Sequence, residues 1–187
     1  VPIIQITDHL INGAGFCERL AKPGASDAPF VEEVVRSILH DKDEYPLSVF
    51  LSQDGEINHP RECDSACYHC LHRYSNQMYH GLLDWRLGLS FLRVLHDGNY
   101  RCGLDRNFSD PAIRDWKRRS RIYAEEVLRF YPSGKLRKAG DLWAFAPSED
   151  GNRWAIIVHP LWDREEMPPI VEEAWMSLEG AGVRRAF

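Results

Sequence analysis

The sequence lacks several features that would assign the chain to a broad class of protein. Its 187 residues contain no apolar run near 18 residues, so no membrane span is predicted. The chain also does not start with a charged segment followed by an apolar one, which is the pattern of a secretory signal peptide. The five cysteines are odd in number and fit a reducing cytosol better than a disulfide scaffold. We therefore expect a cytoplasmic protein with no membrane partner.

Common signatures of catalysis are also missing. There is no Walker A lysine, no Gly-x-Ser-x-Gly and no His-Glu-x-x-His. The Asn12-Gly13-Ala14-Gly15 run lacks the third glycine of the dinucleotide fingerprint, so we interpret it as a close-packed corner between a strand and a helix. The net charge of −5 gives no overall basic signature, so binding to DNA needs a local patch. We expect no enzymatic activity from this chain alone.

The most informative stretch is Cys63-Asp64-Ser65-Ala66-Cys67-Tyr68-His69-Cys70, in which cysteines are spaced C-x3-C-x2-C. Turn-forming residues bound it on both sides. Thiolates this close together on a turn converge on a metal ion more readily than they pair with each other. A disulfide between any two would leave an odd thiol behind. We predict a structural metal-binding loop. Three reduced thiols, or a local disulfide, are the alternatives.

The rest of the sequence predicts an α+β fold, with short strands, a hairpin and several packed helices around the metal-stapled loop. Its length and its 44% hydrophobic content are enough for a sizeable core with a smaller attached lobe. Residue patterns predict strands at 2–7, 47–51, 141–147 and 153–159, the last two as a hairpin, and helices at 28–40, 81–96, 111–131 and 170–179. We predict a metal-binding part at 1–105 and a lobe with the basic helix and the hairpin at 106–187, packed on the first part.

The helix predicted at 111–131 carries the main concentration of basic residues in this acidic chain. Asp110 is its expected N-cap and Pro111 its first residue. The basic side chains of interest are Arg114, Lys117, Arg118 and Arg121. Helical spacing places such residues on one side, where they form either a solvated face or a surface that contacts nucleic-acid phosphates.

Asp141 suggests a different chemistry. It begins a predicted strand, and acidic residues on paired strands can hold Mg²⁺ in nucleases. The neighbouring predicted strand at 153–159 offers neither an acidic residue nor a lysine. A metal-dependent nuclease is therefore an alternative and not the first hypothesis.

Several of these residues together resemble a known family. The matching segments are Cys67-Tyr68-His69-Cys70-Leu71, Tyr74-Ser75-Asn76-Gln77, His80 and Leu83-Asp84-Trp85-Arg86. They resemble the MrfA-like zinc-binding domain at the C-terminus of DEAD/DEAH-type superfamily 2 helicases, which also occurs in the DrmB component of DISARM phage defence. The likeness covers roughly residues 1–97 and includes the glycine corner followed by Glu18.

The resemblance implies a non-catalytic zinc-binding accessory domain of a helicase or helicase-associated protein. Such a domain would support DNA binding or processing in DNA repair or antiviral defence, with a helicase core or subunit as partner and ATP hydrolysis elsewhere. Two alternatives remain open. One is a nuclease-like domain stapled by an iron–sulfur cluster (4Fe-4S), and the other is a protein-interaction scaffold in a defence complex.

The family pattern implies four cysteines on one zinc ion. Cys63, Cys67 and Cys70 match the last three, but the first falls at Arg61, which cannot be a ligand.

The fourth ligand therefore has to come from elsewhere. Cys17 is the first choice because it is a thiol at the start of a predicted helix, beside the glycine corner. His59 is closer in sequence and is the second choice, while His80 and Cys102 are further candidates. Radical-SAM chemistry, which shares the C-x3-C-x2-C spacing, needs a full barrel that 187 residues do not supply.

Overall fold

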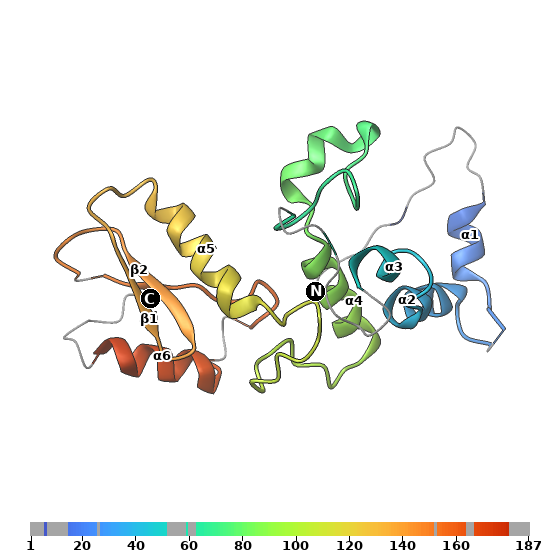
Figure 1. The fold of residues 1–187 in the computed structure, drawn as a ribbon. Helices are drawn as coiled ribbons and strands as arrows, with labels where there is room; N and C mark the ends of the chain where they lie inside the picture. Colours follow the sequence, from blue (N-terminus) through green and yellow to red (C-terminus); the bar gives the residue numbers. More distant parts are fainter. Residues whose placement is uncertain are drawn as a thin grey trace. The chain divides into compact units, whose positions relative to one another are not determined.

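A computed structural model of the chain describes residues 6, 15–25, 27–51, 59, 63–151, 153–163 and 167–179. It contains helices and one three-stranded antiparallel sheet, which confirms the predicted α+β fold (Figure 1). Among these residues, no helix has the length and apolar character needed to cross a membrane. The chain forms two compact units. Unit 1 comprises residues 1–83 and 95–98, and unit 2 comprises 84–94 and 99–187. The predicted boundary between 105 and 106 falls inside unit 2.

The regular elements in the described part of unit 1 are helices. Its elements are α1 (Phe16–Ala21), α2 (Phe30–His40), α3 (Leu47–Phe50) and the 3₁₀ helix η1 (Tyr74–Leu82). Gly15 precedes α1 with a φ of 74°, a left-handed conformation that favours glycine. Helix α2 packs against α1 and α3 and confirms the helix predicted at 28–40. The strand predicted at 2–7 lies outside the described residues except for Ile6.

The strand predicted at 47–51 is wrong, because the structure forms the short helix α3 there. Leu47 and Phe50 are both almost fully buried, with exposed fractions of 3% and 1%. Residues three apart lie on the same side of a helical turn, so one turn buries both. An apolar run this short fits either structure, and packing against α2 decides in favour of the helix.

Unit 2 contains most of the regular structure. Its elements are α4 (Trp85–His96, whose last two residues fall in unit 1), α5 (Trp116–Leu128), β1 (Lys135–Ala139), β2 (Leu142–Ala146), β3 (Ala155–Ile156) and α6 (Pro169–Glu179). The predicted hairpin is confirmed by the antiparallel pairing of β2 with β3, in which Ala144 lies opposite Ile156. The helix predicted at 170–179 is confirmed as α6. Strand β1 was not predicted. It pairs with β2 along its whole length, from Lys135 opposite Ala146 to Ala139 opposite Leu142.

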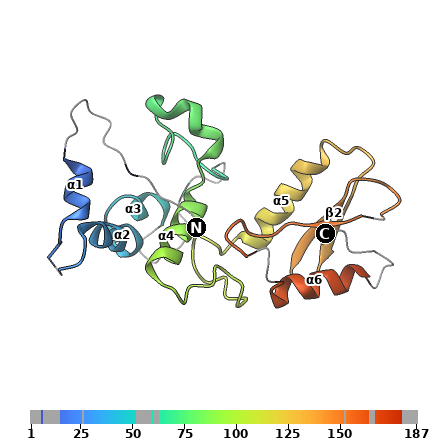
Figure 2. The same cartoon turned by 180° about the vertical axis from the view of Figure 1, so that it is seen from behind.

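The core of unit 2 lies between its sheet and its helices. Figures 1 and 2 show the sheet between α5 and α6. The fully buried side chains here include Ile113, Leu142, Ile170 and Leu178. Each large apolar side chain contributes roughly 1.5–3 kcal/mol when buried. This packed core holds α5 in place, together with the charged residues at its N-terminal end.

Both long helices start later than predicted. Helix α4 begins at Trp85 because Asp84 caps it: its Oδ1 accepts the backbone N–H groups of Arg86 and Leu87 at 2.9 and 3.0 Å. Helix α5 begins at Trp116 instead of residue 111. Asp110 caps the preceding turn instead, accepting the N–H of Ala112 at 2.8 Å. Pro111 therefore belongs to that turn.

Candidate metal centre

Four side chains of unit 1 converge on one point. The ligand atoms of His59, Cys63, Cys67 and Cys70 all lie within 4.8 Å of one another. His59, Cys63 and Cys70 are buried, and Cys67 is half-buried. Buried soft ligands this close together form a candidate metal site.

The distances within the cluster fit one metal ion with four ligands. The Sγ of Cys70 lies 3.8 Å from that of Cys63 and 3.9 Å from that of Cys67, and Cys67 Sγ lies 3.4 Å from His59 Nε2. A tetrahedral ion with metal–sulfur bonds of about 2.3 Å holds its sulfur ligands about 3.8 Å apart. A 4Fe-4S cluster binds each cysteine through a different iron, which requires a wider separation of the sulfurs. The geometry therefore favours a single ion.

The backbone between Cys67 and Cys70 forms a tight turn that brings these two ligands together. The carbonyl of Cys67 accepts the N–H groups of Cys70 and His72, both at 3.0 Å. The N–H of Cys67 donates to Cys70 Sγ at 3.1 Å. The tight turn brings two ligands to the same side, and the sequence spacing C-x2-C is what allows it.

The 3₁₀ helix η1 holds the loop from its other end. Asn76 Nδ2 donates to the carbonyl of Leu71 at 3.0 Å, and Asn76 Oδ1 accepts the N–H of Arg73 at 2.8 Å. Arg73 Nη1 donates to the carbonyl of Cys70 at 2.7 Å. These contacts fix the orientation of the last cysteine. They give a structural role to the Tyr74-Ser75-Asn76-Gln77 segment.

The protein environment affects the three thiols differently. Burial raises the pKa of Cys63, and the neighbouring Cys67 and Cys70 raise it further. Burial also opposes ionisation of Cys67, but hydrogen bonds from the backbone of His69 and from the side chains of Cys63 and Cys70 outweigh it and lower its pKa. A metal ion binds thiolates, so it would have to displace the proton that burial favours on Cys63.

The structure brings His59, the second choice, to the three cysteines, and not Cys17. The Cys17 thiol lies on α1 and donates to the carbonyl of Ile6 at 3.3 Å. The signal for His59 was its position four residues before Cys63, but a thiol was ranked above an imidazole. All five cysteines are free, so the alternative of a local disulfide is wrong.

The other two candidates for the fourth ligand also lie elsewhere. His80 Nε2 is 3.0 Å from Asn76 Oδ1, within η1. Cys102 is buried in unit 2, with its sulfur 3.4 Å from His159 Nδ1. Burial raises the pKa of Cys102 to about 11, so this thiol is protonated at neutral pH.

The predicted basic surface is more neutral than its sequence suggests. Lys117 pairs with Asp141 at 3.0 Å, Arg118 with Asp115 at 3.1 Å, and Arg121 with Glu125 at 2.7 Å. Arg114 donates to the carbonyl of Ser109 at 3.3 Å. The three paired cations remain about half exposed, and surface ion pairs of this kind are weak. A phosphate group can therefore compete for them.

Asp141, the residue that suggested a nuclease, lies just before β2 and pairs with Lys117. Within the described residues it joins no group of three or more metal-binding side chains.

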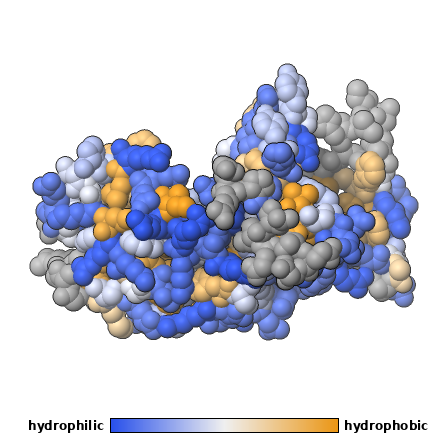
Figure 3. All heavy atoms as spheres, viewed as in Figure 1, coloured by the Kyte–Doolittle hydropathy of each residue, from blue (hydrophilic) through white to orange (hydrophobic). Residues whose placement is uncertain are grey.

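On the face drawn in Figure 3, hydrophilic side chains predominate and hydrophobic ones form small separate groups.

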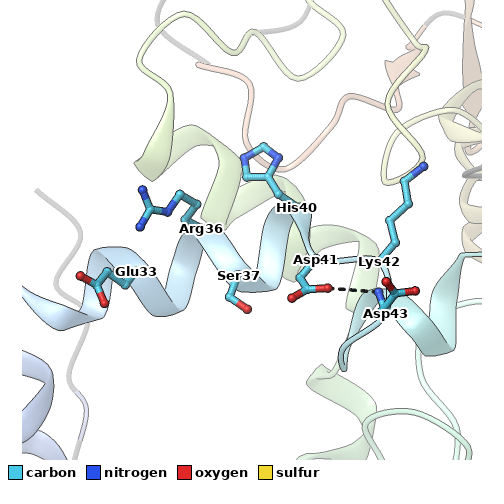
Figure 4. Close-up of a pocket in the computed structure, with 7 residues that line it drawn as sticks. All are labelled: Glu33, Arg36, Ser37, His40, Asp41, Lys42 and Asp43. Atoms are coloured by element: carbon cyan, nitrogen blue, oxygen red, sulfur yellow. Dashed lines mark hydrogen bonds between the residues drawn. The ribbon is translucent and has the colours of Figure 1, made fainter. Parts of the chain in front are cut away.

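An open hollow of about 620 Å³ lies along α2 and the residues after it. Its lining is mixed in charge, from Glu33 and Arg36 to Asp41 and Lys42. Figure 4 shows Arg36 and His40 on one side of the helix and Asp41 on the other, so the charged groups do not converge. This hollow defines no binding site.

No family model, curated protein or solved structure matches the chain. The resemblance to helicase-associated zinc-binding domains therefore rests on the motif residues alone.

Proposed function

We propose that the chain binds one Zn²⁺ ion through His59, Cys63, Cys67 and Cys70, and that this ion is structural. The observation that carries the proposal is the convergence of the four ligand atoms within 4.8 Å. Four protein ligands leave no coordination position for water or substrate, which is the arrangement of structural zinc sites. Structural zinc binding contributes about 10–16 kcal/mol in small zinc-finger peptides, and this energy becomes folding energy.

In this proposal the chain is a non-catalytic accessory domain of a superfamily 2 helicase or of a helicase-associated protein. The segments that support it are the cysteine loop, Tyr74-Ser75-Asn76-Gln77 and Leu83-Asp84-Trp85-Arg86, which resemble the MrfA-like zinc-binding domain. The exposed Lys117, Arg118 and Arg121 support contact with DNA in repair or phage defence.

Elemental analysis of the purified chain, combined with a visible spectrum, tests the metal. We expect one zinc ion per chain and a colourless protein. Iron together with visible absorbance would overturn the choice of zinc and favour the iron–sulfur alternative. A chain that is folded and free of metal would refute the proposal for the metal centre altogether.

The role with DNA needs a separate experiment. We expect the chain to bind single- or double-stranded DNA at low salt, or to associate with a helicase core. Binding should weaken as salt rises, because neutralised phosphates release counterions. Failure of both associations would refute the accessory role while leaving the metal proposal intact.

A further inference from the structure

Unit 2 contains a partly enclosed cavity that plays no part in the metal centre. Its volume is about 100 Å³, several times what one buried water needs. The lining residues are Asp84, Arg86, Leu87, Ala112, Trp116, Arg119, Tyr123, His159 and Pro160. They come from the start of α4, from α5 and the turn before it, and from the segment after β3.

Two buried arginines line the cavity, and each has one carboxylate partner. Arg119 is only 4% exposed and donates to Asp84 Oδ2 at 2.8 Å. Arg86 is 8% exposed and pairs with Asp115 at 3.2 Å. The two ion pairs balance in charge, so the case for an occupant rests on the hydrogen-bond donors of the lining.

Hydrogen-bond donors in the lining lack acceptors. Arg119 Nη1 and Trp116 Nε1 are buried, and neither has a hydrogen-bond partner among the described residues. Both atoms can only donate. Buried polar atoms without partners are rare, and each calls for an explanation such as a bound group.

His159 also lines the cavity, but its ring nitrogens already have partners. Burial lowers its pKa to about 4, so the imidazole is neutral at physiological pH. Its Nδ1 accepts the backbone N–H of Leu161 at 3.2 Å, and its Nε2 lies 3.7 Å from the sulfur of Cys102. The donors without acceptors therefore come from an arginine and an indole, and they need an occupant with several acceptor atoms.

We propose that this cavity binds a phosphate group. A phosphate offers several acceptor oxygens and negative charge at once, and arginine binds it with strong, charge-assisted hydrogen bonds. A single water molecule supplies only one acceptor atom and fills only part of the volume. The phosphate comes either from the free ion or from the end of a nucleic-acid strand. The site lies in unit 2 and does not depend on the proposed zinc ion.

Calorimetric titration of the purified chain with inorganic phosphate, at constant ionic strength, tests the proposal. We expect saturable binding at millimolar concentrations or below. Trp116→Phe removes the indole N–H and keeps an aromatic ring, and Arg119→Lys keeps the charge but loses the planar guanidinium. Each variant should bind about tenfold more weakly, because a hydrogen bond to a charged group is lost. Arg129→Lys is the matched control: it changes an exposed arginine directly after the same helix and outside the lining, and its affinity should equal that of the wild type.

Two results would overturn the proposal. One is the absence of saturable phosphate binding in the wild-type chain, which would leave the cavity to water. The other is unchanged affinity in a folded Trp116→Phe variant, which alone decides the question if Arg119→Lys fails to fold. Competition separates the sources of phosphate. If a 5′-phosphorylated oligothymidylate displaces inorganic phosphate and its 5′-hydroxyl form does not, the ligand is a strand end. If neither displaces it, the ligand is the free ion.

Discussion

Replacement of Asp84 by alanine should destabilise unit 2 more than any exposed substitution, because this one carboxylate has two tasks. Its Oδ1 caps α4 through the N–H groups of Arg86 and Leu87, and its Oδ2 neutralises the buried Arg119. Loss of a helix N-cap costs about 1 kcal/mol. Removal of one partner of a buried ion pair costs about 3–5 kcal/mol, because the other charge stays buried without compensation. Together these losses approach the total stability of many domains, about 5–15 kcal/mol.

Urea denaturation followed by tryptophan fluorescence measures the free energy of unfolding of unit 2. All six tryptophans fall within the residues of unit 2, so the signal reports on that unit. Asp84→Asn keeps an oxygen that can cap α4 and removes the charge. We therefore expect Asp84→Asn to lose most of the 3–5 kcal/mol that belongs to the ion pair. Asp84→Ala should lose about 1 kcal/mol more.

A double-mutant cycle provides the decisive control. Arg119→Met removes the buried cation and keeps much of its apolar stem. The double variant Asp84→Asn with Arg119→Met should be more stable than Asp84→Asn alone, because no unpaired charge remains buried. If the two losses simply add, the carboxylate and the guanidinium are not energetically coupled. The reasoning about the buried pair would then be refuted.

Three further predictions follow from other parts of the chain. Elemental analysis should show that His59→Ala loses most of its bound zinc, whereas Cys17→Ala keeps one zinc ion per chain. The reverse result would identify Cys17 as the fourth ligand. The pKa of His159 is about 4 in the folded state, against an ordinary value of 6.5. Between these pH values the unfolded state binds more protons, so the free energy of unfolding should fall as the pH drops from 6.5 to 4. The loss is about 3 kcal/mol at most, and denaturation of His159→Asn should show a correspondingly smaller pH dependence than the wild type. Charge reversal of Arg118 and Arg121 should weaken DNA binding and reduce its salt dependence, whereas unchanged binding would favour the scaffold alternative.

The metal loop was the part of the site that sequence could predict. Cys63, Cys67 and Cys70 lie within eight residues, so a local turn is enough to bring them together. His59, four residues before Cys63, is the fourth candidate ligand, although the preference for a thiol ranked Cys17 above it. The spacing of three ligands is a local property of the sequence, while the identity of the fourth depends on the fold.

The fold shows the same division. Strongly periodic segments such as 28–40 and 170–179 are helices as predicted, because an apolar stripe determines both the structure and the buried face. Strand β1 escaped prediction because Lys135, Arg137 and Lys138 make it polar, and its pairing with β2 is what makes it a strand. The cavity beside Arg119 could not be predicted either, because its lining residues come from segments more than 70 residues apart in the sequence.

The chain crosses between the two compact units three times, after Leu83, after Val94 and after Gly98. Helix α4 contains the middle crossing, so the division between the units falls inside one helix. No single cut of the polypeptide can therefore release either unit with all of its residues. A truncation designed to isolate the metal-binding half would remove Leu95–Gly98 from it, or would carry along the part of α4 that belongs to the other unit.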